Sequence, residues 1–260
     1  MRLGVGARLE GLALTESRKA AGPLTPTSGR SPEAAGSYIG PPSHPLVGSL
    51  CNLVMQVEQG LWVRSDEAED VAGSLRHALR CVGYLADDPQ TWKWMALALH
   101  SALQGACVCH LTTSFPPVGA VTPRNAAEWI SFAEKSRTDP AAEPPRTQLM
   151  TLPDLLKAVR KPNSAGDRGN GAGVAISDRE LVWLRRFHDE VRNQFVHFEP
   201  MGWALEVSGI PEIGKLVARI IGEIFEIGYG FRHRDPAWRE AFTADLCRLS
   251  TLDLLDKAAA

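Results

Sequence analysis

The sequence predicts an all-α protein: a helical bundle with an irregular insert and a disordered N-terminal tail. From residue 46 onward, apolar residues recur at steps of three and four, which is the spacing of an amphipathic helix. The alternation typical of a strand is confined to a brief piece around Leu205 and Val207. Several long helical patterns with almost no strand pattern favour a bundle.

The composition limits the class of protein. The chain has 260 residues, of which 44% are hydrophobic, as is ordinary for a globular domain. A formal net charge of -2 gives no overall basic field that would attract nucleic acid, although this total does not exclude a local basic patch. No apolar run reaches the ~18 residues of a membrane span. The first apolar tract is interrupted by Arg8 and Glu10, so it makes a poor signal peptide.

The cysteines indicate a cytoplasmic protein. There are 5, an odd number, scattered through apolar helical patterns, so we expect reduced and buried thiols. Cys107 and Cys109 precede His110, but positions two apart on a helix do not converge. No metal site and no cofactor is therefore predicted.

The N-terminal half divides into a tail and three helices. Residues 1–44 are rich in Gly, Pro, Ser and Ala, and cannot offset their ordering entropy, so they are predicted to be a disordered tail. Residues 45–260 are predicted to be a single domain. Its first helix runs from Leu46 to about residue 61, and Ser65 opens the second as its N-cap. The third helix, residues 91–111, is apolar almost all round and should be buried at the centre.

Two polar residues lie within that central helix. His100 and Gln104 are one turn apart, and a buried pair of this kind needs hydrogen-bond partners. One interpretation is a satisfied core pair packed between helices. The other is that His100 and Gln104 line a cleft and contact a substrate.

The middle of the chain is irregular. Residues 113–148 form a proline-rich insert, with a short helix expected around residues 125–136. A helix over residues 149–159 tolerates Pro153 in its first turn. Residues 161–176 form a glycine-rich loop that we expect to be flexible. No apolar strand precedes this loop, so it is a linker rather than a phosphate-binding loop.

A long helix follows, capped by Ser177 and Asp178 and stopped by Pro200. Its apolar stripe predicts the buried face. The stripe consists of Leu184, Phe187, Val191, Phe195 and Phe198. Two more helices are predicted over residues 211–227 and 236–255.

Three polar residues gather near the end of the long helix. Asn193 and His197 are one turn apart, whereas Arg192 lies on the other edge of the apolar stripe. Arg192 and His197 are ~140° apart around a regular helix, too far for one small site. Either the helix ends early, or a second copy of the chain supplies the complement.

This segment, Arg192-Asn193-Gln194-Phe195-Val196-His197, resembles the R-x4-H signature of the HEPN superfamily. The spacing, the polar residue after the Arg and the position late in a helix all match, and the stretch after His197 is similar to bacterial HEPN-like proteins. The resemblance covers about residues 181–209. It implies an all-α, HEPN-like bundle and a metal-independent endoribonuclease. It also implies a homodimer and, as in toxin–antitoxin pairs, an antitoxin protein as partner.

The chemistry fits these residue types. RNA is cut without metal when its 2′-OH attacks the adjacent phosphorus, which requires proton transfers and a cation. Histidine titrates near neutrality and serves as acid or base, and arginine binds phosphate oxygens with two donors. The predicted catalytic residues are Arg192, Asn193 and His197, with Trp203 as a platform on which an RNA base stacks. The alternative is a non-catalytic helical module that dimerises or binds a protein or nucleotide.

Overall fold

Helix α2, Thr91–Leu111, is the central element of the fold, and its bounds match the prediction. α1, α4, α7 and the helical turn η1 all pack against it. The computed structural model describes residues 55–57, 60–63, 65–112, 117–197, 204 and 206–251, with only the backbone at 55–57 and 60–62. The predicted tail, residues 1–44, lies outside the described residues.

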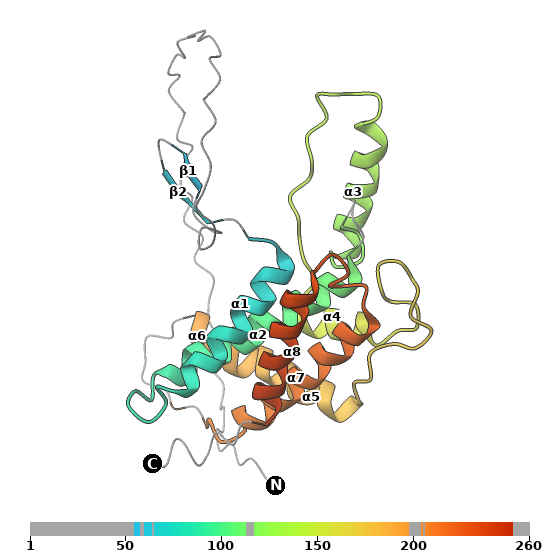
Figure 1. Cartoon of the computed structure of the whole chain (residues 1–260). Coiled ribbons are helices and arrows are strands. Elements are labelled where there is room, and N and C mark those ends of the chain that lie inside the picture. The colour runs from blue at the N-terminus through green and yellow to red at the C-terminus, as the bar shows by residue number, and fades with distance from the viewer. Residues whose placement is uncertain are drawn as a thin grey trace, which may run out of the picture. The chain divides into compact units, whose positions relative to one another are not determined.

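The described elements are helical except for one short hairpin, so the all-α class is confirmed (Figure 1). The elements are β1 (Met55–Val57), β2 (Gly60–Trp62), α1 (Glu67–Val82), α2 (Thr91–Leu111), α3 (Pro123–Lys135), α4 (Leu152–Val159), α5 (Asp178–Arg186), η1 (Phe187–Arg192), α6 (Asn193–Val196), α7 (Ile210–Ile227) and α8 (Pro236–Ser250). Among the described residues, no helix combines the length and the apolar character that crossing a membrane requires.

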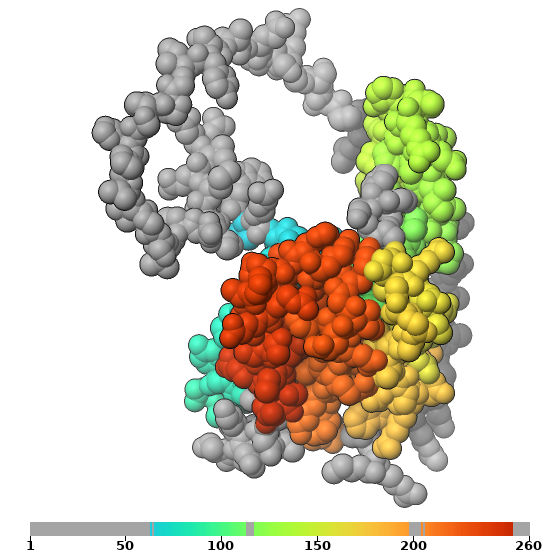
Figure 2. Space-filling model, turned by 45° about the vertical axis from the view of Figure 1, so that its right-hand side comes forward, coloured from blue at the N-terminus to red at the C-terminus, as the bar shows by residue number. Residues whose placement is uncertain are grey.

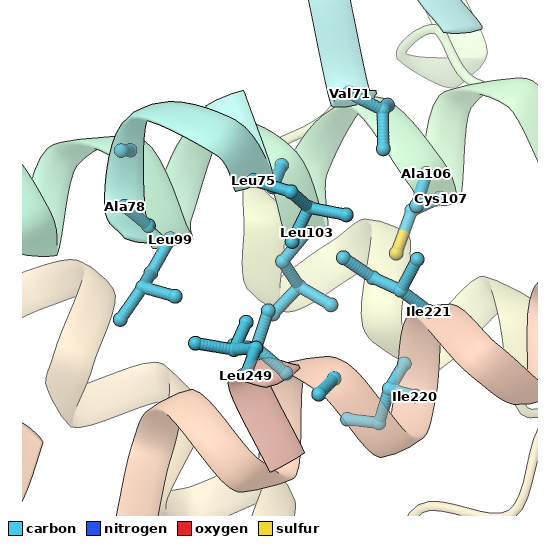
Figure 3. Packing of buried hydrophobic residues seen from close by; sticks show 14 of the residues in the cluster. Val71, Leu75, Ala78, Leu99, Leu103, Ala106, Cys107, Ile220, Ile221 and Leu249 are labelled. Atoms are coloured by element: carbon cyan, nitrogen blue, oxygen red, sulfur yellow. The ribbon is translucent and has the colours of Figure 1, made fainter. Parts of the chain in front are cut away.

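The core forms where α1, α2, α7 and α8 meet. Figure 3 shows Leu75 of α1, Leu103 of α2 and Ile221 of α7 among the side chains packed there. All three are fully buried. Burying a side chain of this size contributes roughly 1.5–3 kcal/mol. α1 and α2 approach so closely that a Cβ on Gly105 would lie 2.7 Å from Cγ2 of Val71.

α7 and α8 lie side by side on one face of the domain, beside the loop of residues 160–176 (Figure 2). Gly228 ends α7 in the left-handed conformation (φ 86°), which glycine adopts without steric cost. An aromatic cluster then joins the two helices. Its members are Phe225, Phe231, Trp238 and Phe242, with the Trp238 and Phe242 rings stacked at 4.8 Å.

The loop of residues 161–176, predicted to be flexible, is tied down by hydrogen bonds. Asn170 accepts from the backbone N–H of Ala165 and donates to the carbonyl of Ala172. The N–H of Gly166 donates to the carbonyl of His110 at the end of α2. A buried Asn with several backbone partners therefore orders a stretch whose composition resembles a linker.

The proline-rich insert holds α3, close to the expected short helix. Buried Asn125 fixes the returning chain, because its amide donates to the carbonyl of Arg146 and accepts from the N–H of Gln148. An isolated bridge pairs Val121 with Leu149. Side-chain hydrogen bonds thus hold the insert together with the buried side chains of Val121 and Trp129.

Four further local predictions were wrong. Part of the predicted helix from Leu46 is the β1–β2 hairpin, where Gly60 and β-branched Val57 disfavour a helix. The N-cap of α1 is Asp66 rather than Ser65, because the Asp66 carboxylate accepts from the N–H of Glu69. Cys247 is exposed, unlike buried Cys81, Cys107 and Cys109. The fourth error is the prediction of one regular long helix, because part of it is a π-helix, and this change affects the candidate site.

Candidate functional site

An open groove of about 770 Å³ lies between the start of α1, one face of α2 and the η1–α6 segment. α2 contributes His100, Ser101 and Gln104, and η1 contributes Arg192. The start of α1 contributes Asp66, Glu67 and Asp70. The fold therefore brings three of the predicted site residues, His100, Gln104 and Arg192, to one surface.

Arg192 is the last residue of η1 and is half-buried. Its Nη1 donates to Oδ1 of Asn193 at 2.9 Å. Within the described part of the chain, no carboxylate lies within ion-pair distance of Arg192. Its positive charge is thus held at the groove by a neutral partner and remains available for an anion.

A hydrogen-bonded pair of histidines adjoins Arg192. His100 Nε2 and His188 Nδ1 are 2.8 Å apart, and the two rings stack with their centroids 5.1 Å apart. His100 is buried, whereas His188 is half-buried. Two side chains 88 positions apart in the sequence therefore meet, and one of them, His100, lines the groove.

Both histidines have lowered pKa values. Burial, followed by the nearby His188 and Arg192 charges, lowers the pKa of His100 from 6.5 to about 3. Burial also lowers the pKa of His188; Asp189 opposes this and Arg192 reinforces it. Both rings are consequently neutral at pH 7, so one donates the shared hydrogen bond and the other accepts it.

A π-helix carries His188 and Arg192. Over Phe187–Arg192 the backbone is wider than an α-helix, and the N–H of Asn193 donates to the carbonyl of His188, five residues back. Of the predicted stripe, Leu184, Phe187 and Phe195 are buried and Val191 is half-buried, whereas Phe198 lies outside the described residues. The prediction of a regular helix is wrong here. The angle of ~140° between Arg192 and His197, which assumed 3.6 residues per turn, does not apply.

His197 lies just outside the helix. α6 ends at Val196, before the predicted stop at Pro200, and His197 follows in an extended conformation with its N–H bonded to the Asn193 carbonyl at 2.8 Å. Its side chain is exposed and is not among the residues that line the groove. The helix thus ends early, as one of the two alternatives required, but this end does not bring His197 to the groove that Arg192 lines. Trp203 lies outside the described residues.

The acidic rim of the groove is partly neutralised. Asp66 and Glu69 form ion pairs with Arg234, which precedes α8. The hydrogen bond from Arg234 is the main cause that lowers the pKa of Asp66. Glu67 and Asp70 have no ion-pair partner in the described ranges and are exposed. They leave negative charge at one end of the groove.

The cysteines and the remaining buried histidine stand apart from the groove. Burial raises the pKa values of Cys107 and Cys109 to about 12, so both are neutral thiols. His110 Nε2 lies 2.9 Å from Oγ of Ser164, which ties the 161–176 loop to α2. No group of three His, Cys, Asp or Glu side chains among the described residues could hold a metal ion.

Sequence reasoning missed His188 as a site residue. It stands four positions before Arg192, which places the two on one side of a helix, and that spacing is a usable signal. Its pairing with His100 depends on the packing of η1 against α2 and could not be read from spacing. Comparisons with family models, curated proteins and solved structures find no match for this chain.

Proposed function

We propose that this protein is a metal-independent endoribonuclease of the HEPN type that acts in the cytoplasm. The observation that carries the proposal is Arg192, a cation held at an open groove by Asn193, with no carboxylate partner in the described chain and with histidines beside it. An RNA phosphodiester has the charge and the paired oxygens that a guanidinium binds best.

The fold supports the same class. The R-x4-H motif begins at the last residue of η1 and ends at His197, directly after α6, so it lies at the end of a helix in an all-α domain, close to where the HEPN resemblance expects it. The described thiols are unpaired, which fits a reducing compartment.

The proposed reaction is an internal transphosphorylation. The 2′-oxygen of a ribose attacks the adjacent phosphorus, its proton passes to a base, and the P–O2′ bond forms as the P–O5′ bond breaks. An acid then protonates the departing 5′-oxygen, leaving a 2′,3′-cyclic phosphate. Arg192 stabilises the phosphate charge, Asn193 orients Arg192, and His197 transfers a proton.

The position of His197 suits an active site that two copies of the chain form together. Because its side chain is exposed at the end of α6, a second copy of the chain can approach it. A two-fold homodimer would set two copies of Arg192 and His197 along one RNA strand. An antitoxin protein that covers this surface would silence the enzyme. Trp203 stays a predicted base platform, and His100 and Gln104 are proposed to contact the substrate.

One observation favours the alternative, a non-catalytic dimerisation or binding module. Glu67 and Asp70 give the groove an acidic end that repels a polyanion and suits a basic protein segment. A module of this kind would bind its partner in the groove without cutting RNA.

The test is RNA cleavage by the purified protein in excess EDTA. The parent should cut, and Arg192→Ala and His197→Ala should each reduce the rate by about 10²–10⁴. Arg186→Ala is the matched control, because Arg186 is paired with Glu190 on the outer side of the same segment. Equal activity of the parent and Arg192→Ala would reject the proposed function.

A further inference from the structure

The His100–His188 pair has no packing role that requires two imidazoles. α2 is strongly apolar and largely buried, and buried His100 interrupts its run of Leu and Ala side chains. A buried imidazole costs free energy unless it is hydrogen-bonded, and an aliphatic side chain would fill the space without that cost. The pair also coincides with a π-helix, a feature found often at functional sites.

One ring nitrogen of His100 is not used in the hydrogen bond of the pair and can contact a substrate in the groove. His100 Nε2 is occupied by His188, and this is the only side-chain hydrogen bond that His100 forms among the described residues, so its Nδ1 is left for a substrate. His100 lines the groove together with Arg192, so a phosphodiester bound to the guanidinium would lie beside the imidazole. His188 stands behind His100 and next in the chain to Asp189.

The charged surroundings keep both rings neutral before the reaction, which is the state that a base requires. Arg192 on η1 disfavours a cation on either ring, and Asp189 favours one on His188. Across the groove, α1 contributes Asp66, Glu67 and Asp70. The faces that α4 and α7 bury in the core with α2 are apolar and carry no titratable group.

We propose that the His100–His188 pair acts as the general base in the groove and removes the proton from the attacking 2′-OH. His100 is the catalytic residue and His188 its positioning residue. This inference rests on the proposed function and supplies, within one chain, the second proton-transfer group that His197 alone does not provide.

The proton balance is simple. At the start, His100 Nε2–H donates to His188 Nδ1, and His100 Nδ1 carries a lone pair. Nδ1 takes the proton of the 2′-OH as the P–O2′ bond forms, and the Nε2 proton moves to His188 Nδ1. The positive charge ends on His188, beside Asp189 and farther from the buried helix. His197 gives its proton to the departing 5′-oxygen.

The experiment is the pH dependence of the cleavage rate in EDTA, from about pH 3 to about pH 9, for the parent, His100→Gln and His188→Asn. Both variants should lose about 10²–10⁴ in rate, and the fall of the rate on the acid side should disappear. His188→Asn is the more informative, because a half-buried residue tolerates substitution. His233→Asn, at an exposed histidine, is the control and should keep the parental profile.

The outcomes separate the two proposals. If the parent cuts RNA and depends on Arg192, but His188→Asn keeps both its rate and its acid-side fall, the base is elsewhere and only this inference fails. If the parent does not cut RNA, the proposed function fails and the inference fails with it. A folded His188→Asn protein, shown by an unchanged circular dichroism spectrum, that has lost the acid-side fall would support both.

Discussion

Arg192 donates a hydrogen bond to the side chain of its own neighbour, Asn193, at 2.9 Å. A neutral acceptor orients the guanidinium without cancelling its charge, whereas a carboxylate would do both. The residue after the arginine therefore controls how strongly the groove attracts an anion.

Replacing Asn193 by Asp tests this relationship. Asn193→Asp keeps the acceptor but adds a negative charge, so we expect RNA to bind about tenfold more weakly. Asn193→Ala should weaken binding less, because the charge of Arg192 survives. The measurement is fluorescence anisotropy with an uncleavable 2′-O-methyl RNA. Equal affinity of the parent and Asn193→Asp would show that Arg192 does not contact the RNA.

The start of α1 gives a second prediction, on stability. Asp66 caps the helix and pairs with Arg234, whereas the hydroxyl of Ser65 caps nothing. Asp66→Ala should lower the free energy of unfolding by about 1–2 kcal/mol, and Ser65→Ala should change it by less than about 0.5 kcal/mol. Urea denaturation measures both. A larger loss for Ser65→Ala would reassign the N-cap.

The contact between α1 and α2 gives a third prediction. A methyl group on Gly105 would meet the stiff, fully buried side chain of Val71, so Gly105→Ala should cost about 1–3 kcal/mol. Gly222 lies inside α7 with nothing within 4 Å of an added Cβ. Gly222→Ala should therefore stabilise the protein by about 0.5–1 kcal/mol. Thermal melting of the two variants should move in opposite directions; a shared direction would refute the close packing.

His110 gives a prediction on pH. Burial lowers its pKa from 6.5 to about 4, so between these values the unfolded chain holds a proton that the folded protein lacks. The free energy of unfolding should fall as the pH drops through this window, by up to ~1.4 kcal/mol per pH unit for this one histidine. His110→Gln should show a shallower decline in urea denaturation at several pH values. An unchanged slope would mean that His110 titrates normally.

The sequence predicted the helices that carry a strong apolar pattern. α2 has the predicted bounds, and α7 differs by one residue, because long apolar runs and caps are local signals. The predicted Ser177 cap is confirmed by a reciprocal capping box with Glu180. The β1–β2 hairpin was missed since three-residue strands leave no reliable periodicity.

The candidate site could be predicted only in part. Arg192, His100 and Gln104 were each singled out, and the packing of η1 on α2 brings them to one groove. The role of His188 depends on a contact between distant segments and on a π-helix, neither of which has a single-sequence signature. The placement of His197 outside the groove follows from where α6 ends, which spacing alone did not fix.

The measurement that tests the central claim most directly compares two strands of one sequence in excess EDTA, one of RNA and one carrying 2′-O-methyl groups. The proposed mechanism predicts that the parent cuts only the RNA strand and leaves 2′,3′-cyclic phosphate and 5′-hydroxyl ends, and that Arg192→Ala cuts neither. Cleavage of the 2′-O-methyl strand, or RNA products that carry 5′-phosphates, would contradict it, because neither can arise from attack by the 2′-OH.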